Sequence, residues 1–273
     1  MTQSIWKRSD LADLRQAVRL LETSNFFTEL TDFVGPKVAK GMRVLPKKAK
    51  KYIDLATEKS LIAAAKVAFF TLKGGGRLVA GDRTHKFAVA STGAAGGFFS
   101  WLGLVIELPV TTVVMLRSIA DIAKAEQADI ADPRIQMECL AVLTMGAANS
   151  SGEDESYYAG RFAFAQLFSQ LGQIPPRKGG ASAAKKLAEW LSALVARLLP
   201  RYAPMVTEKA IAQAAPFLGA VGGAVINSIF MNHFQNKAHG HFVVLRLEKT
   251  YGIDAVKKRY ERYAAAMRDA SRK

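Results

Sequence analysis

Apolar residues recur along this chain every three or four positions, which is the spacing of one face of an α-helix. Two such stripes stand out, Leu11, Leu14, Val18 and Leu21 near the start, and Leu187, Trp190, Leu191, Leu194 and Leu198 further on. Alternating apolar and polar positions bounded by hairpin turns, which would predict strands, do not occur. The pattern therefore predicts an all-α protein of eight to ten helices.

Proline, glycine and aspartate mark where several of these helices begin and end. Pro109 is expected to open a helix over Val110–Ala128, because proline suits the first helical turn. Asp132-Pro133 is expected to begin the next helix, which runs to about Met145. Gly252 is expected to end a helix, and Asp254 to cap the last one.

Two long uncharged runs raise the question of a membrane. Residues 87–106 contain no charge, and residues 210–236 contain none if His233 is neutral. About 20 apolar residues can span a bilayer as a helix, but the first run is rich in Gly, Ala, Ser and Thr, and the second carries several amides. Small residues let helices approach closely. We expect two Gly/Ala-rich buried helical segments, with a segment lying on or in a membrane and a true span as the alternatives.

The domain organisation expected from the sequence is simple. A chain of 273 residues, half of them apolar, can bury a sizeable core. We expect one multi-helix bundle over residues 1–273, with a subdivision possible only at the Pro- and Gly-rich residues 172–182. Cys139 is the single cysteine, which excludes a disulfide scaffold.

Charge adds a second feature to this apolar chain. The net charge is +15, and seven basic residues without an acidic one lie in residues 37–51. These seven are Lys37, Lys40, Arg43, Lys47, Lys48, Lys50 and Lys51. A cationic cluster is attracted to anionic lipid, whereas nucleic-acid binding calls for stacking platforms or a recognisable module, which we do not find. An anionic membrane surface is the expected partner, and the alternative is that these residues form a solvated helix face.

Signatures of enzymes and cofactor sites are missing. The chain contains no P-loop, no dinucleotide-binding glycine motif, no G-x-S-x-G and no H-E-x-x-H. We therefore expect no cofactor. His233, His239 and His241 cluster in the sequence and are weak candidates for a metal site, but polar residues in a turn around Gly240, with one hydrogen-bonded histidine, are the favoured interpretation.

Glu107 lies between two apolar runs and is the carboxylate with the most unusual position. It could be an active-site acid, with His241 as a base and Arg117 or Arg246 as cationic partners. The simpler interpretation is a structural ion pair with a residue of another helix, such as Arg246. We expect Glu107 near the amino end of the helix that follows it, where the helix dipole favours a carboxylate.

Residues distributed over most of the chain resemble the bacterial EcsC family. The central stretch Glu107–Ala123 (ELPVTTVVMLRSIADIA) carries the resemblance most specifically, together with Gly93–Gly97, Tyr157–Arg161 and His241–Gly252. The founding member is encoded beside an ABC transporter. The resemblance implies a helical bacterial protein without an established activity, and a role beside a membrane.

Three functions follow as hypotheses. The first is a non-enzymatic accessory protein, peripheral to the inner face of a bacterial membrane and working with a transport or secretion system. The second is an enzyme acting on a lipid or phosphate-bearing substrate with Glu107 and His241 in a central cleft. The third is an integral membrane protein. Residues 1–10 have no apolar secretion segment, so the cytoplasm is the expected location; the oligomeric state stays open.

Overall fold

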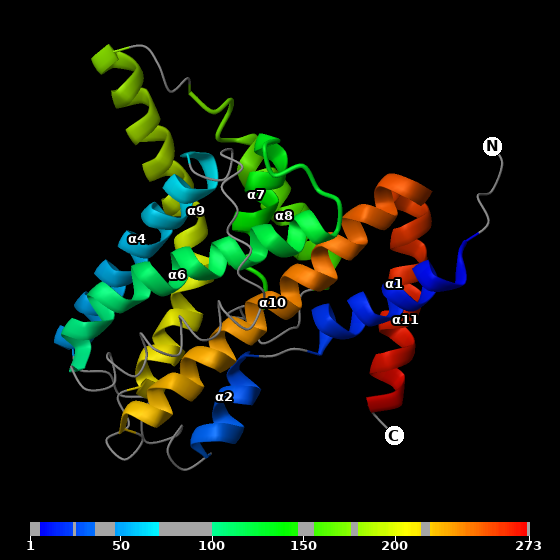
Figure 1. Cartoon of the computed structure of the whole chain (residues 1–273), viewed down its shortest axis with the longest axis horizontal. Coiled ribbons are helices and arrows are strands. Elements are labelled where there is room, and N and C mark those ends of the chain that lie inside the picture. Colours follow the sequence, from blue (N-terminus) through cyan, green and yellow to red (C-terminus); the bar gives the residue numbers. More distant parts are fainter. Residues whose placement is uncertain are drawn as a thin grey trace.

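The computed structural model of the chain is built from α-helices (Figure 1). It describes residues 6–23, 26–35, 47–70, 100–146, 156–175, 180–213 and 219–271, and within these ranges every regular element is a helix. The helices are α1 (Arg8–Glu22), α2 (Phe26–Val34), α4 (Lys47–Phe70), α6 (Ser100–Ala125), α7 (Pro133–Val142), α8 (Tyr157–Ser169), α9 (Gly180–Gln213), α10 (Gly219–Tyr251) and α11 (Ile253–Ser271). The all-α prediction is confirmed.

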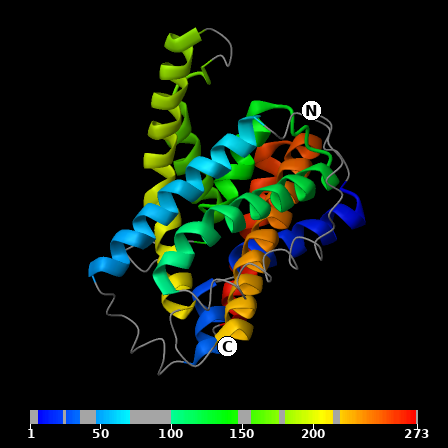
Figure 2. The same cartoon turned by 60° about the vertical axis from the view of Figure 1, so that its left-hand side comes forward.

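The long helix α10 runs through the molecule and joins two groups of helices (Figures 1 and 2). Its amino-terminal half contributes to the larger hydrophobic core, to which α2, α4, α6, α7 and α9 also contribute and which includes Met115, Leu194, Tyr202 and Phe230. Its carboxy-terminal half packs with α1 and α11 around a smaller core. The larger core contains residues from both sides of 172–182, although residues 176–179 lie outside the described ranges.

Gly240 lies where α1 crosses α10. A Cβ at this position would lie 2.6 Å from Cγ of Leu21 and 3.0 Å from the carbonyl oxygen of Ala17. The missing side chain thus allows the two helices to approach closely. The prediction of a turn around Gly240 was wrong, because the residue lies inside the continuous helix α10. Glycine has a low helix propensity, but the close packing of α1 against α10 at this position offsets it, so the helix continues through Gly240.

Other predicted boundaries met different outcomes. Asp132 caps α7 by accepting a hydrogen bond from the backbone N–H of Arg134 at 2.8 Å, and Gly252 ends α10 with φ +87°. Both predictions are confirmed. Pro109 instead lies inside α6, which begins at Ser100, so the expected helix start at Pro109 was wrong. A proline removes one helical hydrogen bond, but the helix continues on both sides of it.

The two uncharged runs are described to different extents. Residues 87–99 of the first run lie outside the described residues, and residues 100–106 form the first turns of α6. The second run is divided between the end of α9 and the start of α10, where Gly222 and Gly223 are buried. Among the helices of the described ranges, none combines the length and the apolar content that crossing a bilayer requires.

Several helix ends lie together at one end of the molecule, which we call the convergent end. Helices α4, α6 and α10 begin there and α9 ends there, toward the lower left of Figure 1 and the bottom and lower left of Figure 2. The opposite end of α9, at Gly180, projects away from it in both views. The convergent end places the candidate residues described next.

Candidate functional site

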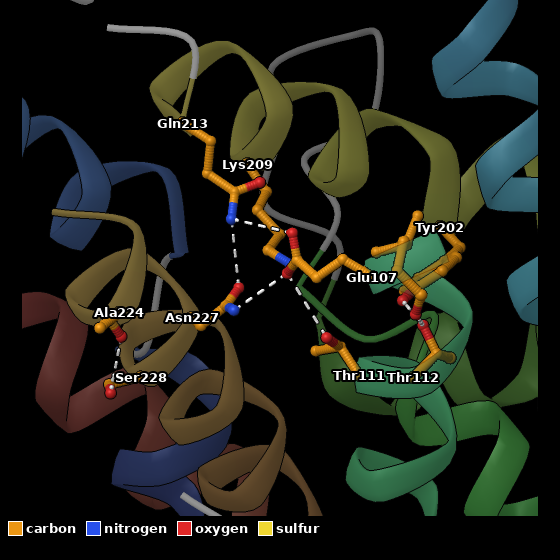
Figure 3. A network of polar contacts seen from close by, with 10 residues as sticks. Glu107, Thr111, Thr112, Tyr202, Lys209, Gln213, Ala224, Asn227 and Ser228 are labelled. Atoms are coloured by element: carbon orange, nitrogen blue, oxygen red, sulfur yellow. Dashed lines mark hydrogen bonds and ion pairs between the residues drawn. The ribbon is translucent and has the colours of Figure 1, made fainter. Parts of the chain in front are cut away.

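Glu107 forms a buried ion pair close to the convergent end (Figure 3). Its Oε1 lies 2.8 Å from Nζ of Lys209 on α9 and accepts a hydrogen bond from Nδ2 of Asn227 on α10 at 2.9 Å. Glu107 itself is on α6, so three helices meet at one carboxylate. The side chains of Lys209 and Glu107 are 0% and 5% exposed. This is the structural ion pair that the simpler interpretation of Glu107 predicted, but the partner suggested there, Arg246, was wrong, because the cation beside Glu107 is Lys209.

Further polar groups complete this network. Gln213 donates from Nε2 to Oε2 of Glu107 and to Oδ1 of Asn227, both at 3.4 Å, and Thr111 donates to Oε1 of Glu107 at 3.4 Å. Nζ of Lys209 also lies 5.1 Å above the ring of Phe230. We call Glu107, Thr111, Lys209, Gln213 and Asn227 the Glu107 network. Both carboxylate oxygens have donors, which is what a buried charge requires.

The network fixes the protonation state of Glu107. Burial alone would raise the pKa of its carboxyl, but the charge of Lys209 and the hydrogen bonds from Lys209, Asn227 and Gln213 outweigh burial and hold the pKa below its ordinary value. Glu107 is consequently an ionised acceptor at neutral pH and a poor proton donor. Its expected place at the amino end of a helix was wrong, because seven residues of α6 precede it. The ammonium of Lys209, not a helix dipole, stabilises the charge.

His241 belongs to a second network, around the carboxy-terminal half of α10. Its Nδ1 lies 2.8 Å from the hydroxyl of Tyr157, and its Nε2 lies 3.0 Å from Oε2 of Glu138. Burial would raise the pKa of Glu138, but the hydrogen bond and charge of His241 and the charge of Arg161 lower it. Burial raises the pKa of Tyr157, which therefore stays a neutral phenol.

The same network continues onto neighbouring helices. Arg161 donates to both oxygens of Glu248, at 2.7 and 2.8 Å, and the hydroxyl of Tyr158 donates to Oε1 of Glu248 at 2.8 Å. The rings of Tyr157, Tyr158 and Tyr260 contact one another with centroids 5.2 Å apart, two pairs edge to face and the pair Tyr157–Tyr260 tilted. We call Glu138, Tyr157, Tyr158, Arg161, His241 and Glu248 the His241 network. It joins α7, α8 and α10 by hydrogen bonds.

The two networks are separate, so the structure does not bring Glu107 and His241 into one cleft. Asn227, which contacts Glu107, and His241 lie fourteen positions apart on α10, about 21 Å along a helix axis. Arg246 lies further along and pairs with Asp13 and Glu126, each at 2.7 Å. Arg117 lies on α6, ten positions from Glu107 and half-buried. The proposed catalytic grouping is not assembled.

The three histidines that were weak metal candidates lie along α10. His233 donates from Nε2 to the carbonyl oxygen of Met145 at 3.3 Å, and burial together with the charge of Lys237 lowers its pKa to about 3. A neutral buried imidazole is the expected hydrogen-bonded histidine. Within the described ranges, no three His, Cys, Asp or Glu side chains gather in a way that could hold a metal ion. Cys139 is buried, and burial raises the pKa of its thiol.

The basic stretch lies partly at the convergent end. Lys47, Lys48, Lys50 and Lys51 fall in the first turns of α4, and Lys50 and Lys51 are exposed. Lys37, Lys40 and Arg43 lie outside the described residues.

Large exposed apolar side chains lie at the same end. Five are in the first three turns of the helices that begin there: Tyr52 and Leu55 on α4, Ile106 and Val110 on α6, and Val221 on α10. Phe162 on α8 and Ile253 on α11 are also exposed but belong to other parts of the molecule. Lysines beside exposed apolar groups give the convergent end a mixed cationic and apolar character.

The sequence patterns did not predict three members of the Glu107 network, Lys209, Gln213 and Asn227. A signal for Lys209 exists, because it lies three, four and seven positions after Val206, Met205 and Tyr202, all of which are buried. This spacing places a lysine on the apolar face of α9, where only a paired charge is tolerated.

The comparisons with known proteins agree with the resemblance found in the sequence. The model of the EcsC protein family matches residues 19–247 of the chain. No curated protein and no solved structure matches it. Glu107, Lys209, Asn227 and His241 all fall within the matched range. Since the match covers well over half of the chain, this protein belongs to the EcsC family.

Proposed function

We propose that this protein is a non-enzymatic accessory protein that binds the cytoplasmic face of an anionic bacterial membrane through its convergent end, and there supports a transport or secretion system. The observation that carries the proposal is the combination of exposed lysines and exposed apolar side chains on the first turns of α4, α6 and α10. Peripheral membrane proteins use these two kinds of residue together.

The charge at the convergent end favours an anionic surface. Residues 47–53 contain four lysines and no acidic residue, and Lys50 and Lys51 are exposed. Each lysine near an anionic bilayer contributes about 1 kcal/mol of attraction. The net charge of +15 adds long-range attraction, which salt screens.

The buried networks support a role without catalysis. Glu107 is held ionised by Lys209, and His241 is held between Tyr157 and Glu138. Groups that already satisfy one another act as connections between helices. An acid–base pair for catalysis would instead need an acid and a base within reach of one substrate, and these two networks lie far apart along α10.

Sedimentation with vesicles tests the proposal. Wild-type protein and the variant Lys50→Gln/Lys51→Gln would be titrated with vesicles containing one third phosphatidylglycerol. We expect the variant to bind about 30-fold more weakly, since two lysines contribute about 2 kcal/mol. The matched control is Lys185→Gln/Lys186→Gln, an adjacent exposed pair at the far end of α9, which should bind like the wild type.

Two results would contradict the proposal. The first is that wild-type protein stays in the supernatant at low salt with anionic vesicles. The second is that the two double variants lose the same affinity, because binding would then depend on total charge and not on the convergent end.

A further inference from the structure

Three aliphatic side chains at the convergent end project into solvent to an unusual degree. Ile106 is 75% exposed, Val221 is 78% exposed and Val110 is 47% exposed. Ile106 and Val110 are one helical turn apart on α6, so they share a face. Val221 lies in the first turn of α10. Removing such side chains from water is favourable. The described residues of the fold do not bury them.

The buried Glu107 network begins one residue after the exposed Ile106. Glu107 follows Ile106 in α6, yet its carboxylate faces the ammonium of Lys209 and the amides of Asn227 and Gln213. The charge next to the exposed isoleucine is therefore already neutralised and hydrogen-bonded. Entering an apolar medium at this point would not strip water from an unpaired charge, which is the step that normally prevents it.

The lysines of α4 set the chemistry of the medium. Lys50 and Lys51 are exposed beside Tyr52, which is itself partly exposed. Lysine side chains extend their ammonium groups toward phosphate oxygens while their stems lie along apolar surface, and tyrosine prefers the boundary between headgroups and acyl chains. Ammonium groups and a tyrosine ring near the start of α4 are side chains that the headgroup region of an anionic leaflet favours.

We infer that Ile106, Val110 and Val221 insert among the acyl chains of the anionic leaflet, while Lys50 and Lys51 remain at the headgroup phosphates. This insertion rests on the proposed function and names what the convergent end binds, namely the acyl chains of loosely packed lipids. Inserted side chains need gaps between headgroups, so binding should be stronger on unsaturated or highly curved membranes than on saturated, flat ones of equal charge.

Single fluorescent labels test where the side chains lie. The variants Ile106→Cys and Val221→Cys would carry the polarity-sensitive dye NBD, with Ile253→Cys and Phe162→Cys as matched controls at exposed apolar positions elsewhere. The native Cys139 is fully buried, and burial raises the pKa of its thiol, so the folded protein should be labelled only at the new cysteine.

With vesicles of phosphatidylcholine and phosphatidylglycerol, we expect a blue shift and a several-fold rise in NBD emission at 106 and 221. Lipids brominated on the acyl chains should quench both labels, and labels at 253 and 162 should not change. In unlabelled protein, Ile106→Ser should lower the vesicle partition coefficient about ten-fold, whereas Ile253→Ser should leave it unchanged.

The outcomes separate this inference from the proposed function. If the protein sediments with anionic vesicles while labels at 106 and 221 stay in water, binding is electrostatic only and the insertion is wrong. An equal blue shift at 253 would likewise overturn the insertion, by showing that another face docks. If neither the labelled nor the wild-type protein sediments with anionic vesicles, the proposed function itself is wrong.

Discussion

The two halves of α10 each carry a polar network, and the networks differ in how they hold charge. In the amino-terminal half, one carboxylate and one ammonium lie together with amides from α9 and α10, and both charged side chains are almost fully buried. In the carboxy-terminal half, His241 and Glu248 are connected through tyrosine hydroxyls and Arg161, and the Glu138 and Arg161 side chains are 25% and 20% exposed.

This difference matches the surfaces beside them. The His241 network is covered by α1 and α11 through Tyr260, whose hydroxyl donates to Glu22 at 2.7 Å. In the Glu107 network, by contrast, Glu107 lies in α6 between the exposed aliphatic residues Ile106 and Val110. A buried ion pair contributes little net stability compared with apolar packing. Because its two charges neutralise each other, however, an exposed apolar side chain such as Ile106 can follow in the chain without an unpaired charge beside it.

The largest expected effect comes from breaking the ion pair of the Glu107 network. Lys209→Met or Glu107→Gln alone should cost about 3–5 kcal/mol of unfolding free energy, because each leaves a buried partner uncompensated. The double variant Glu107→Gln/Lys209→Met should lose less than the sum of the two. Urea denaturation at pH 7 measures all three.

An exposed pair provides the control for this cycle. Lys185 and Glu189 lie 4.0 Å apart and are 79% and 65% exposed, so removing either should cost less than about 0.5 kcal/mol. If the losses at Glu107 and Lys209 were additive, the two side chains would not form the ion pair that the structure shows.

The pH dependence of stability follows from the same ion pair. Because the pKa of Glu107 is lowered in the fold, the ion pair stabilises the folded protein above the ordinary pKa of 4.5. This contribution is lost as the pH falls through the lowered pKa.

A smaller effect is expected from Arg161 in the His241 network. Arg161→Met removes two hydrogen bonds to Glu248 and should cost about 2–3 kcal/mol, while Arg161→Lys should recover part of this because the charge remains and the paired geometry is lost. The midpoint of thermal unfolding, measured for each variant, ranks the two losses of stability. A loss equal to that of Lys209→Met would mean that the two networks hold charge equally tightly.

Tyr157→Phe should have a still smaller effect. It removes the hydroxyl that contacts Nδ1 of His241 but keeps the ring, so we expect a loss of about 1 kcal/mol. Tyr263→Phe, on the half-buried ring beneath Arg15, serves as the control. If the two variants have the same stability, the hydroxyl of Tyr157 does not hold the histidine.

The smallest effect concerns Glu208, the neighbour of Lys209 on α9. Burial raises the pKa of its carboxyl to about 7, the opposite direction from Glu107. Below pH 4.5 the carboxyl is protonated in both states; between about 4.5 and 7 only the unfolded chain ionises, so stability falls as the pH rises.

Glu208→Gln should accordingly raise the thermal midpoint at pH 8 by on the order of 2 °C, because the half-buried group is partly screened by solvent. It should have no effect at pH 4. A midpoint that rises equally at both pH values would show that the carboxyl does not titrate in this window.

The sequence predicted the parts of this fold that depend on local periodicity. Leu194 and Leu198 are buried as their spacing required, and so are Leu14 and Val18 of the first stripe. Pro109 was placed at a helix start because proline is favourable there, but tertiary packing of α6 against α4 and α10 sustains a helix through it. Local preference is overruled where a helix is held on several sides.

The candidate site was only partly predictable. Glu107 drew attention because a charge between apolar runs must be paired, and this proved correct. Its partners are 102 and 120 residues away, on helices whose register no local pattern determines. Lys209 could have been recognised by its place on the apolar stripe of α9. The histidines clustered in sequence but contact different partners around α10. His233 and His241 are eight positions and about 12 Å apart along the helix axis, and His239 and His241, two positions apart, face different sides.

Flotation of the wild-type protein with vesicles of matched size and acyl composition measures whether the protein binds an anionic membrane. Vesicles of phosphatidylcholine alone would be compared with vesicles that contain one third phosphatidylglycerol, at low and at high salt. We expect the protein to float with the anionic vesicles, far less of it to float with neutral ones, and salt to weaken the binding. Equal flotation with both kinds of vesicle, or none with either, would contradict it.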